Sequence, residues 1–274
     1  MKPSIIFLLT LSIILSFTSC NKRNDLEPEI KFKTTEGTIV VRLYAETPKH
    51  RDNFVKLVES GYYNGMLFHR VIRDFMIQSG DPESKKAKKK QFLGSGDVNY
   101  SIPAEIVYPR YYHKKGALAA ARQGDDTNPE RASSGGQFYF VKGHKFTDKQ
   151  LDSLESVRKI KVEKYLIDKY IKLRLGKSEI QKKGNSEKIK QITDSISSLV
   201  KNEIASKPEL YKFNAEQRET YKTIGGTPHL DGEYTVFGEV IEGVDMVSNI
   251  SKAKTDKNDR PLENIRIIEA TRIR

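Results

Sequence analysis

The 274-residue chain has no tryptophan, a single cysteine and no apolar run of comfortable membrane-spanning length. Because Cys20 is the only thiol, a disulfide within the chain is excluded. The apolar run at residues 4–17 has fourteen residues, whereas a transmembrane helix needs about 20. The five histidines show no metal-ligand spacing with a cysteine or carboxylate cluster, so we expect no metal site.

The chain also has fewer acidic than basic residues. It contains 36 Asp and Glu against 48 Lys and Arg, which gives a net charge of +12. A basic balance is compatible with nucleic acid, an anionic membrane surface or an ordinary solvated surface. The lysines are scattered among acids and no nucleic-acid-binding module is recognisable, so we expect no nucleic-acid partner. The lysine-rich run 85–90 is interpreted as a solvated loop, with a membrane-surface contact as the alternative.

The N-terminal residues have the organisation of a secretory signal. A short basic start at residues 1–3 precedes the apolar run, and small residues follow at 18–20. A charged start, an apolar middle and small residues before a cleavage point are typical of a secretory signal. The pattern therefore predicts an extracytoplasmic protein of the cell envelope.

The end of this signal, Phe17–Cys20, resembles a bacterial lipobox, in which Cys20 becomes the lipidated first residue of the mature chain. Phe17 stands where leucine is usual, and the alternative is an ordinary signal peptide with a chance cysteine. We expect residues 1–20 to be a lipoprotein signal peptide and residues 21–29 to be a polar tether. The protein would then be lipid-anchored to a membrane, facing the periplasm or at the outer membrane.

Most of the remaining chain predicts short strands. Apolar and polar residues alternate over 30–34 and 38–44 around a Glu-Gly turn, which predicts a β-hairpin. Thr47 as cap and Pro48 at the first position then predict a helix that ends at Gly61. Further strands are predicted around 66–72, 75–79, 116–121, 137–141, 234–240 and 265–273, with a second short helix around 244–250. Many short strands with few helices favour a mainly β fold and a closed barrel.

Residues 147–222 break this rhythm. Thr147–Gln150 is a capping-box pattern, and apolar residues at three- and four-residue steps over 151–173 predict an amphipathic helix that stops at Gly176. The pattern repeats over 189–204, and a shorter helix is predicted from Asn214. Two long helices in tandem predict an antiparallel helical hairpin, inserted between two strands of the barrel.

The segment Phe68–Pro82 places Arg70 beside a strand that carries Phe75, Met76 and Gln78. A fixed cation next to apolar side chains suits a neutral, apolar ligand with one polar handle, and a peptidyl-proline fits that description. Taken alone, Phe75 and Met76 could instead be barrel core, and Arg70 a structural ion-pair partner.

Four segments resemble, in the same order, the cyclophilin family of peptidyl-prolyl isomerases: Phe68–Gln78, Lys115–Arg122, Ser133–Phe140 and Leu230–Val240. The resemblance implies a closed antiparallel eight-stranded barrel capped by two helices. Residues 30–146 and 223–274 would form this barrel, and residues 147–222 would be a helical insertion outside the resemblance.

The resemblance also implies a site in which Arg70 is catalytic and Gln78 holds its guanidinium in place. The residues implied to contact the substrate are Phe75, Met76, Ala121, Arg122, Gln137, Tyr139, Leu230 and Tyr234. Four positions depart from common family residues. Tyr139 stands for Phe, Tyr234 for His, Arg122 for Asn and His229 for Trp.

The chemistry of such a site requires no cofactor. Rotation about the planar X–Pro bond has a barrier of about 18–20 kcal/mol, and no bond is broken as the amide twists. Neither a nucleophile nor a proton shuttle is needed, only a donor that binds the twisted amide better than the planar one. Arg70 suits this role because its guanidinium is always charged and presents several N–H donors in a rigid fork.

These observations predict a monomeric peptidyl-prolyl cis–trans isomerase, a rotamase. It would act on proline-containing segments of unfolded or flexible extracytoplasmic proteins and assist their folding. An alternative is a non-catalytic module that binds proline peptides, with the helical insertion as a chaperone arm. A purely structural lipoprotein is a third reading, against which the intact set of Arg70, Phe75, Met76 and Gln78 argues.

Overall fold

The structure is a computed structural model that describes residues 27–180 and 186–274. The described residues divide into two compact units, one formed by residues 27–144 with Gly225–Arg274, the other within Lys145–Ile224. The predicted signal peptide, Cys20 and most of the predicted tether lie outside the described residues. Among the helices of the described residues, none has the length and apolar character needed to cross a bilayer.

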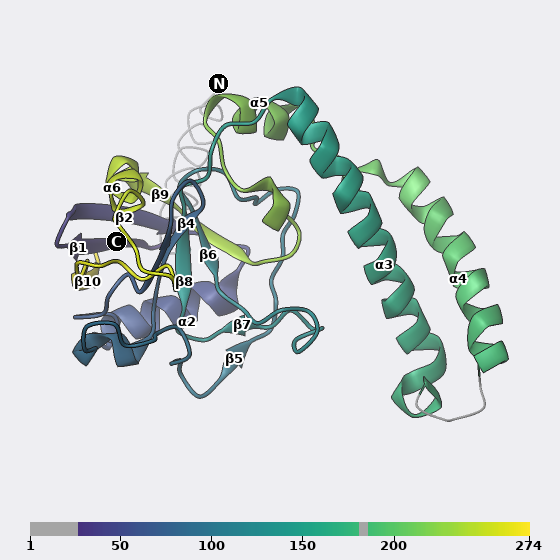
Figure 1. The fold of residues 1–274 in the computed structure, drawn as a ribbon, viewed down its shortest axis with the longest axis horizontal. Helices are drawn as coiled ribbons and strands as arrows, with labels where there is room; N and C mark the ends of the chain where they lie inside the picture. The colour runs from purple at the N-terminus through teal and green to yellow at the C-terminus, as the bar shows by residue number, and fades with distance from the viewer. Residues whose placement is uncertain (1–26, 181–185) are drawn as a thin grey trace, which may run out of the picture. The chain divides into compact units, whose positions relative to one another are not determined.

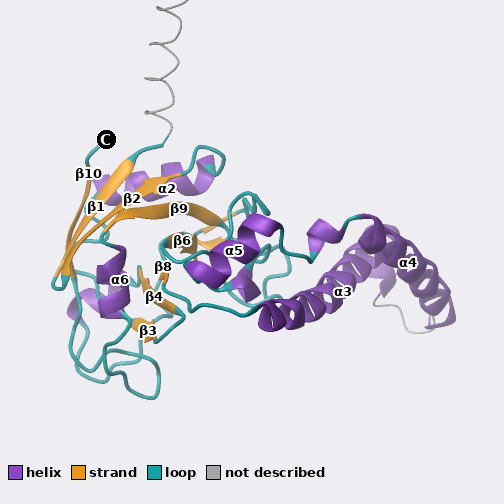
Figure 2. Ribbon diagram, turned by 90° about the horizontal axis from the view of Figure 1, so that it is seen from above, coloured by secondary structure: helices purple, strands orange, loops and turns teal. Residues whose placement is uncertain are grey.

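The first unit is built on an eight-stranded antiparallel sheet (Figure 2), with strand order β10-β1-β2-β9-β6-β8-β4-β3. Its strands are β1 Glu29–Thr34, β2 Gly37–Leu43, β3 Arg70–Ile72, β4 Met76–Ser79, β6 Ala117–Ala120, β8 Phe138–Val141, β9 Val236–Glu242 and β10 Ile267–Arg272. A two-stranded sheet pairs β5 Ser101–Ile102 with β7 Ser133–Ser134. Short 3-10 helices lie at η1 Pro82–Lys86 and η3 Pro228–Leu230 in this unit and at η2 Pro208–Leu210 in the second.

The prediction of eight antiparallel strands is confirmed, but the prediction of a closed, mainly β barrel is wrong. The strand order is linear, with β10 and β3 as its ends. Residues 65–68 reach residues 265–267 through three backbone hydrogen bonds and the isolated bridge of Leu67 with Arg266, but β3 itself begins only at Arg70 and is three residues long. The result is a curled half-barrel, and the helices make the composition mixed α/β.

One face of the sheet packs into an aromatic core. The Phe32 ring centroid lies 5.8 Å from those of Phe138 and Phe140 and 6.1 Å from that of Phe54, on helix α2 Pro48–Glu59. Helix α6 Val244–Ile250 buries Val247 and Ile250 in the same core, so both predicted helices cover the sheet (Figure 1). Burying each such aromatic side chain contributes about 1.5–3 kcal/mol.

The N-terminus of α2 is capped by a residue that is distant in sequence. Thr47 occupies the cap position but makes no side-chain cap hydrogen bond, so that detail of the prediction is wrong. The Glu105 carboxylate accepts hydrogen bonds from the backbone N–H groups of Lys49 and His50 at 3.1 and 3.0 Å. The same carboxylate lies 2.7 Å from Nδ1 of the buried His50 ring. One acidic side chain therefore accepts from two N–H groups that have no partner within the helix, and its negative charge interacts favourably with the positive end of the helix dipole.

Replacing Glu105 with alanine is expected to lower the free energy of unfolding by about 2 kcal/mol, because two backbone donors and the buried His50 ring lose their acceptor. Chemical denaturation measures the change. Glu130→Ala removes an exposed carboxylate and is the matched control. Equal stability of the two variants would contradict the capping role.

The second unit is helical, with α3 Asp148–Ile180, α4 Ser186–Ser206 and α5 Ala215–Thr223. The α3–α4 pair packs Leu166 against Ile196, Val200 and Ile204 (Figure 1). Tyr170 on α3 donates a hydrogen bond to Glu203 on α4 at 2.8 Å. The two long tandem helices therefore form the hairpin that their apolar patterns indicate.

Two details of the predicted hairpin are wrong. Helix α3 continues through Gly176 to Ile180, because one glycine costs a helix only about 1 kcal/mol. Its predicted apolar stripe is also only partly buried, since the side chains of Val157, Ile160 and Leu173 are 52%, 69% and 72% exposed. Both predicted capping boxes are present, at Thr147 with Gln150 and at Asn214 with Gln217.

Candidate active site

A row of side chains crosses the sheet on the face opposite the aromatic core. Arg70 on β3 pairs with Gln78 on β4, Gln78 with Tyr139 on β8, and Tyr139 with Ala119 on β6. Directly opposed residues in an antiparallel ladder project to the same face, and successive residues alternate between faces. Phe138 therefore lies in the core while its neighbour Tyr139 belongs to a separate apolar cluster.

Amide side chains hold Arg70 through a chain of hydrogen bonds. Its Nη1 donates to Gln78 Oε1 at 3.4 Å, and Gln78 Nε2 donates to Gln137 Oε1 at 2.8 Å. Gln137 Nε2 in turn donates to the carbonyls of Gly94 and Gly96 at 3.0 and 2.6 Å. Each amide therefore uses its oxygen toward Arg70 and its nitrogen away from it, so the chain has one direction.

The guanidinium of Arg70 is accessible. Its side chain is 43% exposed, and its Nε lies 3.4 Å from Oδ2 of Asp259, which is 42% exposed. Among the described residues, the Arg70 guanidinium makes no hydrogen bond or ion pair besides those with Asp259 and Gln78. Because a guanidinium has five N–H donors, several remain for a ligand.

The apolar residues predicted for the site form one cluster, distinct from the core of the sheet. Met76 and Tyr139 are buried members, and partly buried side chains pack against them, among them Phe75, Ala121, Leu230 and Tyr234. The Phe75 ring also lies 5.4 Å from the ring of His229, the residue that stands where the family often has Trp. The structure thus brings all predicted apolar site residues to the sheet face that carries Arg70.

Beneath this cluster lies a buried polar network that the sequence analysis did not predict. Nε2 of His113 lies 3.0 Å from the Tyr139 hydroxyl, and its Nδ1 lies 3.0 Å from Oδ1 of Asp231. Asp231 also accepts from the backbone N–H of His113 at 2.8 Å. With Nδ1–H donating to Asp231, Nε2 accepts from the hydroxyl. Burial raises the pKa of Tyr139 well above its usual range, so the hydroxyl keeps its proton.

Tyr139→Phe is expected to lower the free energy of unfolding by about 1–2 kcal/mol, because the buried His113 Nε2 loses its donor. The apolar ring remains, so isomerase activity should change less than about threefold. Tyr234→Phe is the control for stability, since the Tyr234 hydroxyl has no hydrogen bond within the described residues. Equal unfolding midpoints in urea for the two variants would contradict this role of His113.

The Arg122 side chain packs against its own loop and the segment at Glu233 and Tyr234 rather than projecting outward. Its guanidinium lies 4.4 Å from the centroid of the Tyr234 ring, donates to the carbonyl of Glu233 at 2.8 Å and pairs with Asp125 at 2.7 Å. The side chain is only 3% exposed. A peptide beside Ala121 and Arg122 would therefore meet the backbone, which fits strand-like binding of an extended chain.

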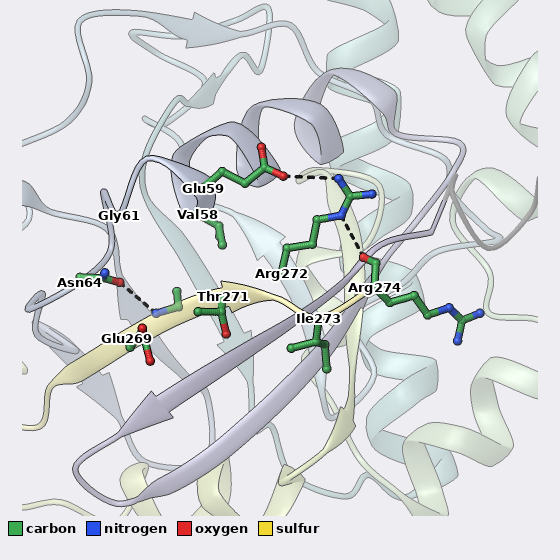
Figure 3. A pocket seen from close by; sticks show the side chains of 10 residues that line it. Val58, Glu59, Gly61, Asn64, Glu269, Thr271, Arg272, Ile273 and Arg274 are labelled. Carbon is green, nitrogen blue, oxygen red and sulfur yellow. Dashed lines mark hydrogen bonds and ion pairs between the residues drawn. The ribbon is translucent and has the colours of Figure 1, made fainter.

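A hollow of about 590 Å³ lies elsewhere, where the end of α2 meets β10 (Figure 3). Its lining includes Val58, Asn64 and residues 269–274, and an ion pair of Glu59 with Arg272 crosses it at 3.4 Å. None of its lining residues belongs to the predicted site. The candidate active site therefore rests on the row of side chains across the sheet.

Comparison with known proteins assigns the family. The family model described as cyclophilin type peptidyl-prolyl cis-trans isomerase/CLD matches residues 29–164 and 174–272. The chain belongs to this cyclophilin family. The enzyme is thus a peptidyl-prolyl cis–trans isomerase, as predicted. The matched ranges also extend over much of the helical unit Lys145–Ile224.

Individual relatives agree with this assignment. A Staphylococcus saprophyticus protein named for peptidyl-prolyl cis-trans isomerase activity is 28% identical over 246 residues, which covers 89% of this chain and 91% of that protein. A solved cyclophilin-type isomerase of Cryptosporidium parvum superposes with a TM-score of 0.51 at 19% identity, covering 90% of this chain and 97% of the other. At that identity the likeness shows the cyclophilin-like fold.

Proposed function

We propose that this cyclophilin uses Arg70 to isomerise X–Pro bonds in unfolded or flexible extracytoplasmic proteins. The row of Arg70, Gln78 and Tyr139 across the sheet carries the proposal, because it places an accessible cation beside an apolar cluster. A structure of the C. parvum isomerase, with a TM-score of 0.50, was determined in the presence of the dipeptide Ala-Pro, which supports a proline-containing peptide as ligand.

The proposed mechanism needs only binding and orientation. Phe75, Met76, Tyr139 and Leu230 would receive the pyrrolidine ring, while the backbone near Ala121 would hold the flanking peptide. The predicted substrate contact through the Gln137 side chain is dropped, because Gln137 is buried and its amide is already bonded to Gln78, Gly94 and Gly96. As the X–Pro bond twists, conjugation is lost and the lone pair localises on the proline nitrogen. A guanidinium N–H of Arg70 would donate to that nitrogen, stabilising the twisted amide more than the planar one. Gln78 and Gln137 would keep the donor oriented before the substrate arrives.

The proposed place of action is the cell envelope, with the monomer anchored through a lipid on Cys20 and no nucleic-acid partner. The basic start, the apolar run of fourteen residues and the Phe17–Cys20 segment support this. Incorporation of labelled fatty acid into the wild type but not into Cys20→Ala is the expected result. Incorporation of the fatty acid into neither protein would contradict the lipid anchor and support the alternative of an ordinary signal peptide.

Turnover and binding must be measured on the same proline-containing tetrapeptide to test the proposed function. The wild type is expected to accelerate cis–trans exchange, which takes tens to hundreds of seconds uncatalysed. Saturable binding of the tetrapeptide without acceleration of its cis–trans exchange would contradict catalysis and support the non-catalytic binding module. A protein whose refolding is limited by proline isomerisation extends the test to unfolded chains.

A chaperone role is the second candidate, favoured by the exposed Val157, Ile160 and Leu173 side chains of α3. His144 and Gly226 exchange backbone hydrogen bonds at 3.3 and 3.0 Å, so a short Gly-Ser linker can replace residues 146–224 between ends that already lie together. Retained turnover on tetrapeptides with lost suppression of aggregation would support client capture by the helical unit. Unchanged suppression would exclude it.

A further inference from the structure

Asp259, which contacts Arg70, lies in a tight turn of residues 256–260. Asp256 Oδ1 accepts hydrogen bonds from the backbone N–H groups of Asn258 and Arg260 at 2.8 and 3.1 Å. The backbone of Asp256 donates to the carbonyl of Arg260 at 2.8 Å and accepts from the N–H of Asp259 at 3.1 Å. Four hydrogen bonds within five residues hold the turn in one conformation.

The turn is fixed to the rest of the unit from two sides. The Arg260 guanidinium, on a residue only 6% exposed, donates to the carbonyls of Lys88 and Gln91 at 3.0 and 2.5 Å. On the other side, the backbone N–H of Val71 on the edge strand β3 donates to the carbonyl of Asp259 at 2.8 Å. The backbone of Asp259 therefore lies beside β3, one residue away from Arg70.

The conformation of Asp259 is unusual for a residue with a side chain. Its φ is 61°, in the left-handed region, where a Cβ is disfavoured and where Asp and Asn are better tolerated than most residues. Glycine would adopt this conformation without strain. Left-handed residues held by their surroundings cluster at functional sites, which directs attention to what the carboxylate contacts. Its Oδ2 lies 3.4 Å from Arg70 Nε.

We infer that Asp259 is a positioning residue, which together with Gln78 fixes the plane of the Arg70 guanidinium; this rests on the proposed catalytic role of Arg70. Asp259 contacts Nε and Gln78 contacts Nη1, so two different nitrogen atoms are held and rotation of the fork is restricted. The N–H groups that remain then have a fixed direction toward the substrate. Fixed orientation is what makes such a donor effective in a transition state.

An opposing effect is that the carboxylate partly neutralises the cation. Both side chains are about two-fifths exposed, so water screens their attraction and keeps this effect small. Orientation depends on geometry and is not weakened by the solvent in the same way. Removing the carboxylate is therefore expected to slow the enzyme rather than to activate it.

Asp259→Gly is the informative variant, because glycine relieves the left-handed strain and so does not weaken the turn through its backbone. We expect kcat to fall about fivefold with KM unchanged. Asp259→Asn keeps an acceptor and tolerates the same backbone, so it should restore kcat to within about twofold of wild type. Lys90→Gly, at another left-handed residue with φ 63°, is the matched control and should leave kcat unchanged. An unchanged kcat in Asp259→Gly, or an equal loss in Lys90→Gly, overturns the inference.

A double-mutant cycle separates positioning from an independent role. In the Arg70→Ala background, Asp259→Gly should cause no further loss, because the group it positions is absent. A further fivefold loss there would overturn the inference. The cycle also separates this inference from the proposed function: if Arg70→Ala abolishes turnover while Asp259→Gly equals wild type, only the positioning role fails. If Arg70→Ala itself retains full turnover, the proposed role of Arg70 fails, and the positioning role with it.

Discussion

Replacing Arg70 with alanine is expected to lower kcat/KM for a proline-containing tetrapeptide about 100- to 1,000-fold, the range that follows removal of one preorganised donor in other active sites. The physical reason is that isomerisation breaks no bond, so selective binding of the twisted amide is the whole of the catalysis. No other cationic side chain occupies the cross-strand row of Arg70, Gln78, Tyr139 and Ala119. Peptide binding should persist, because the apolar cluster remains intact.

Arg73→Ala is the matched control, since Arg73 is an exposed arginine on the turn between β3 and β4 and its loss changes the charge equally. Thermal unfolding of Arg70→Ala should match that of wild type within a few degrees, because Arg70 is 43% exposed and exposed ion pairs contribute little. The kcat/KM of Arg70→Lys should lie between those of Arg70→Ala and Arg73→Ala, since an ammonium keeps the charge but lacks the planar fork. Full activity in Arg70→Ala would exclude the mechanism.

Local sequence patterns predicted much of this molecule because they report alternation and turns. The alternation over 138–140 is an example: Phe138 and Phe140 enter the core while Tyr139 faces the opposite side. The same holds for the hairpin of β1 and β2, where Gly37 adopts a φ of 137°. The residues that the family resemblance assigns to the site could be placed together because the β-ladder brings distant strands into register.

Contacts between segments far apart in sequence could not be predicted in this way. Glu105 caps a helix more than fifty residues before it, and no local signal at Thr47 distinguishes a cap that is used from one that is not. Asp259 reaches Arg70 from a turn near the C-terminus, and His113 meets Tyr139 from a loop. Each pairing depends on the folded topology, which alternation alone does not determine.

The closed barrel was wrong for a related reason. Residues 66–72 are predicted as one strand, yet only Arg70–Ile72 joins the regular ladder. The residues before it meet the opposite end of the sheet through three backbone hydrogen bonds and the isolated bridge at Leu67. Periodicity shows that a segment can be a strand, whereas closure depends on how many hydrogen bonds the two ends share. The partly exposed apolar stripe of α3 could not be predicted for the same reason. The periodicity of a helix shows which side chains share a face, but not how much of that face another element covers.

Acidification is expected to destabilise the protein through His69, the residue before Arg70. His69 is 2% exposed, and neither ring nitrogen has a hydrogen-bond partner in the part of the chain that the structure describes. Burial lowers the pKa of His69 from 6.5 to about 4, the neighbouring Asp81 opposing the shift and the cations of Arg70 and Arg260 adding to it. In the unfolded chain the same ring titrates near its ordinary pKa of about 6.5.

The direction of the effect follows from proton binding. Between pH 6.5 and 4 the unfolded chain carries a proton on His69 and the folded protein does not, so lowering the pH favours unfolding. The stability that His69 contributes is therefore fully present above pH 6.5 and is lost as the pH falls toward 4. Since each pH unit in this window corresponds to about 1.4 kcal/mol, the loss approaches about 3 kcal/mol, a large part of a typical folding free energy.

His69→Phe keeps a buried ring and removes the titration, so it isolates this contribution. Between pH 7 and pH 4.5 the free energy of unfolding in urea should fall by about 2–3 kcal/mol more in the wild type than in the variant. Part of the acid sensitivity will remain, because burial also lowers the pKa of His50 in both proteins. His144→Gln removes an exposed histidine and should follow the wild type. If His69→Phe loses as much stability as the wild type over this range, the buried ring is not the acid-sensitive group.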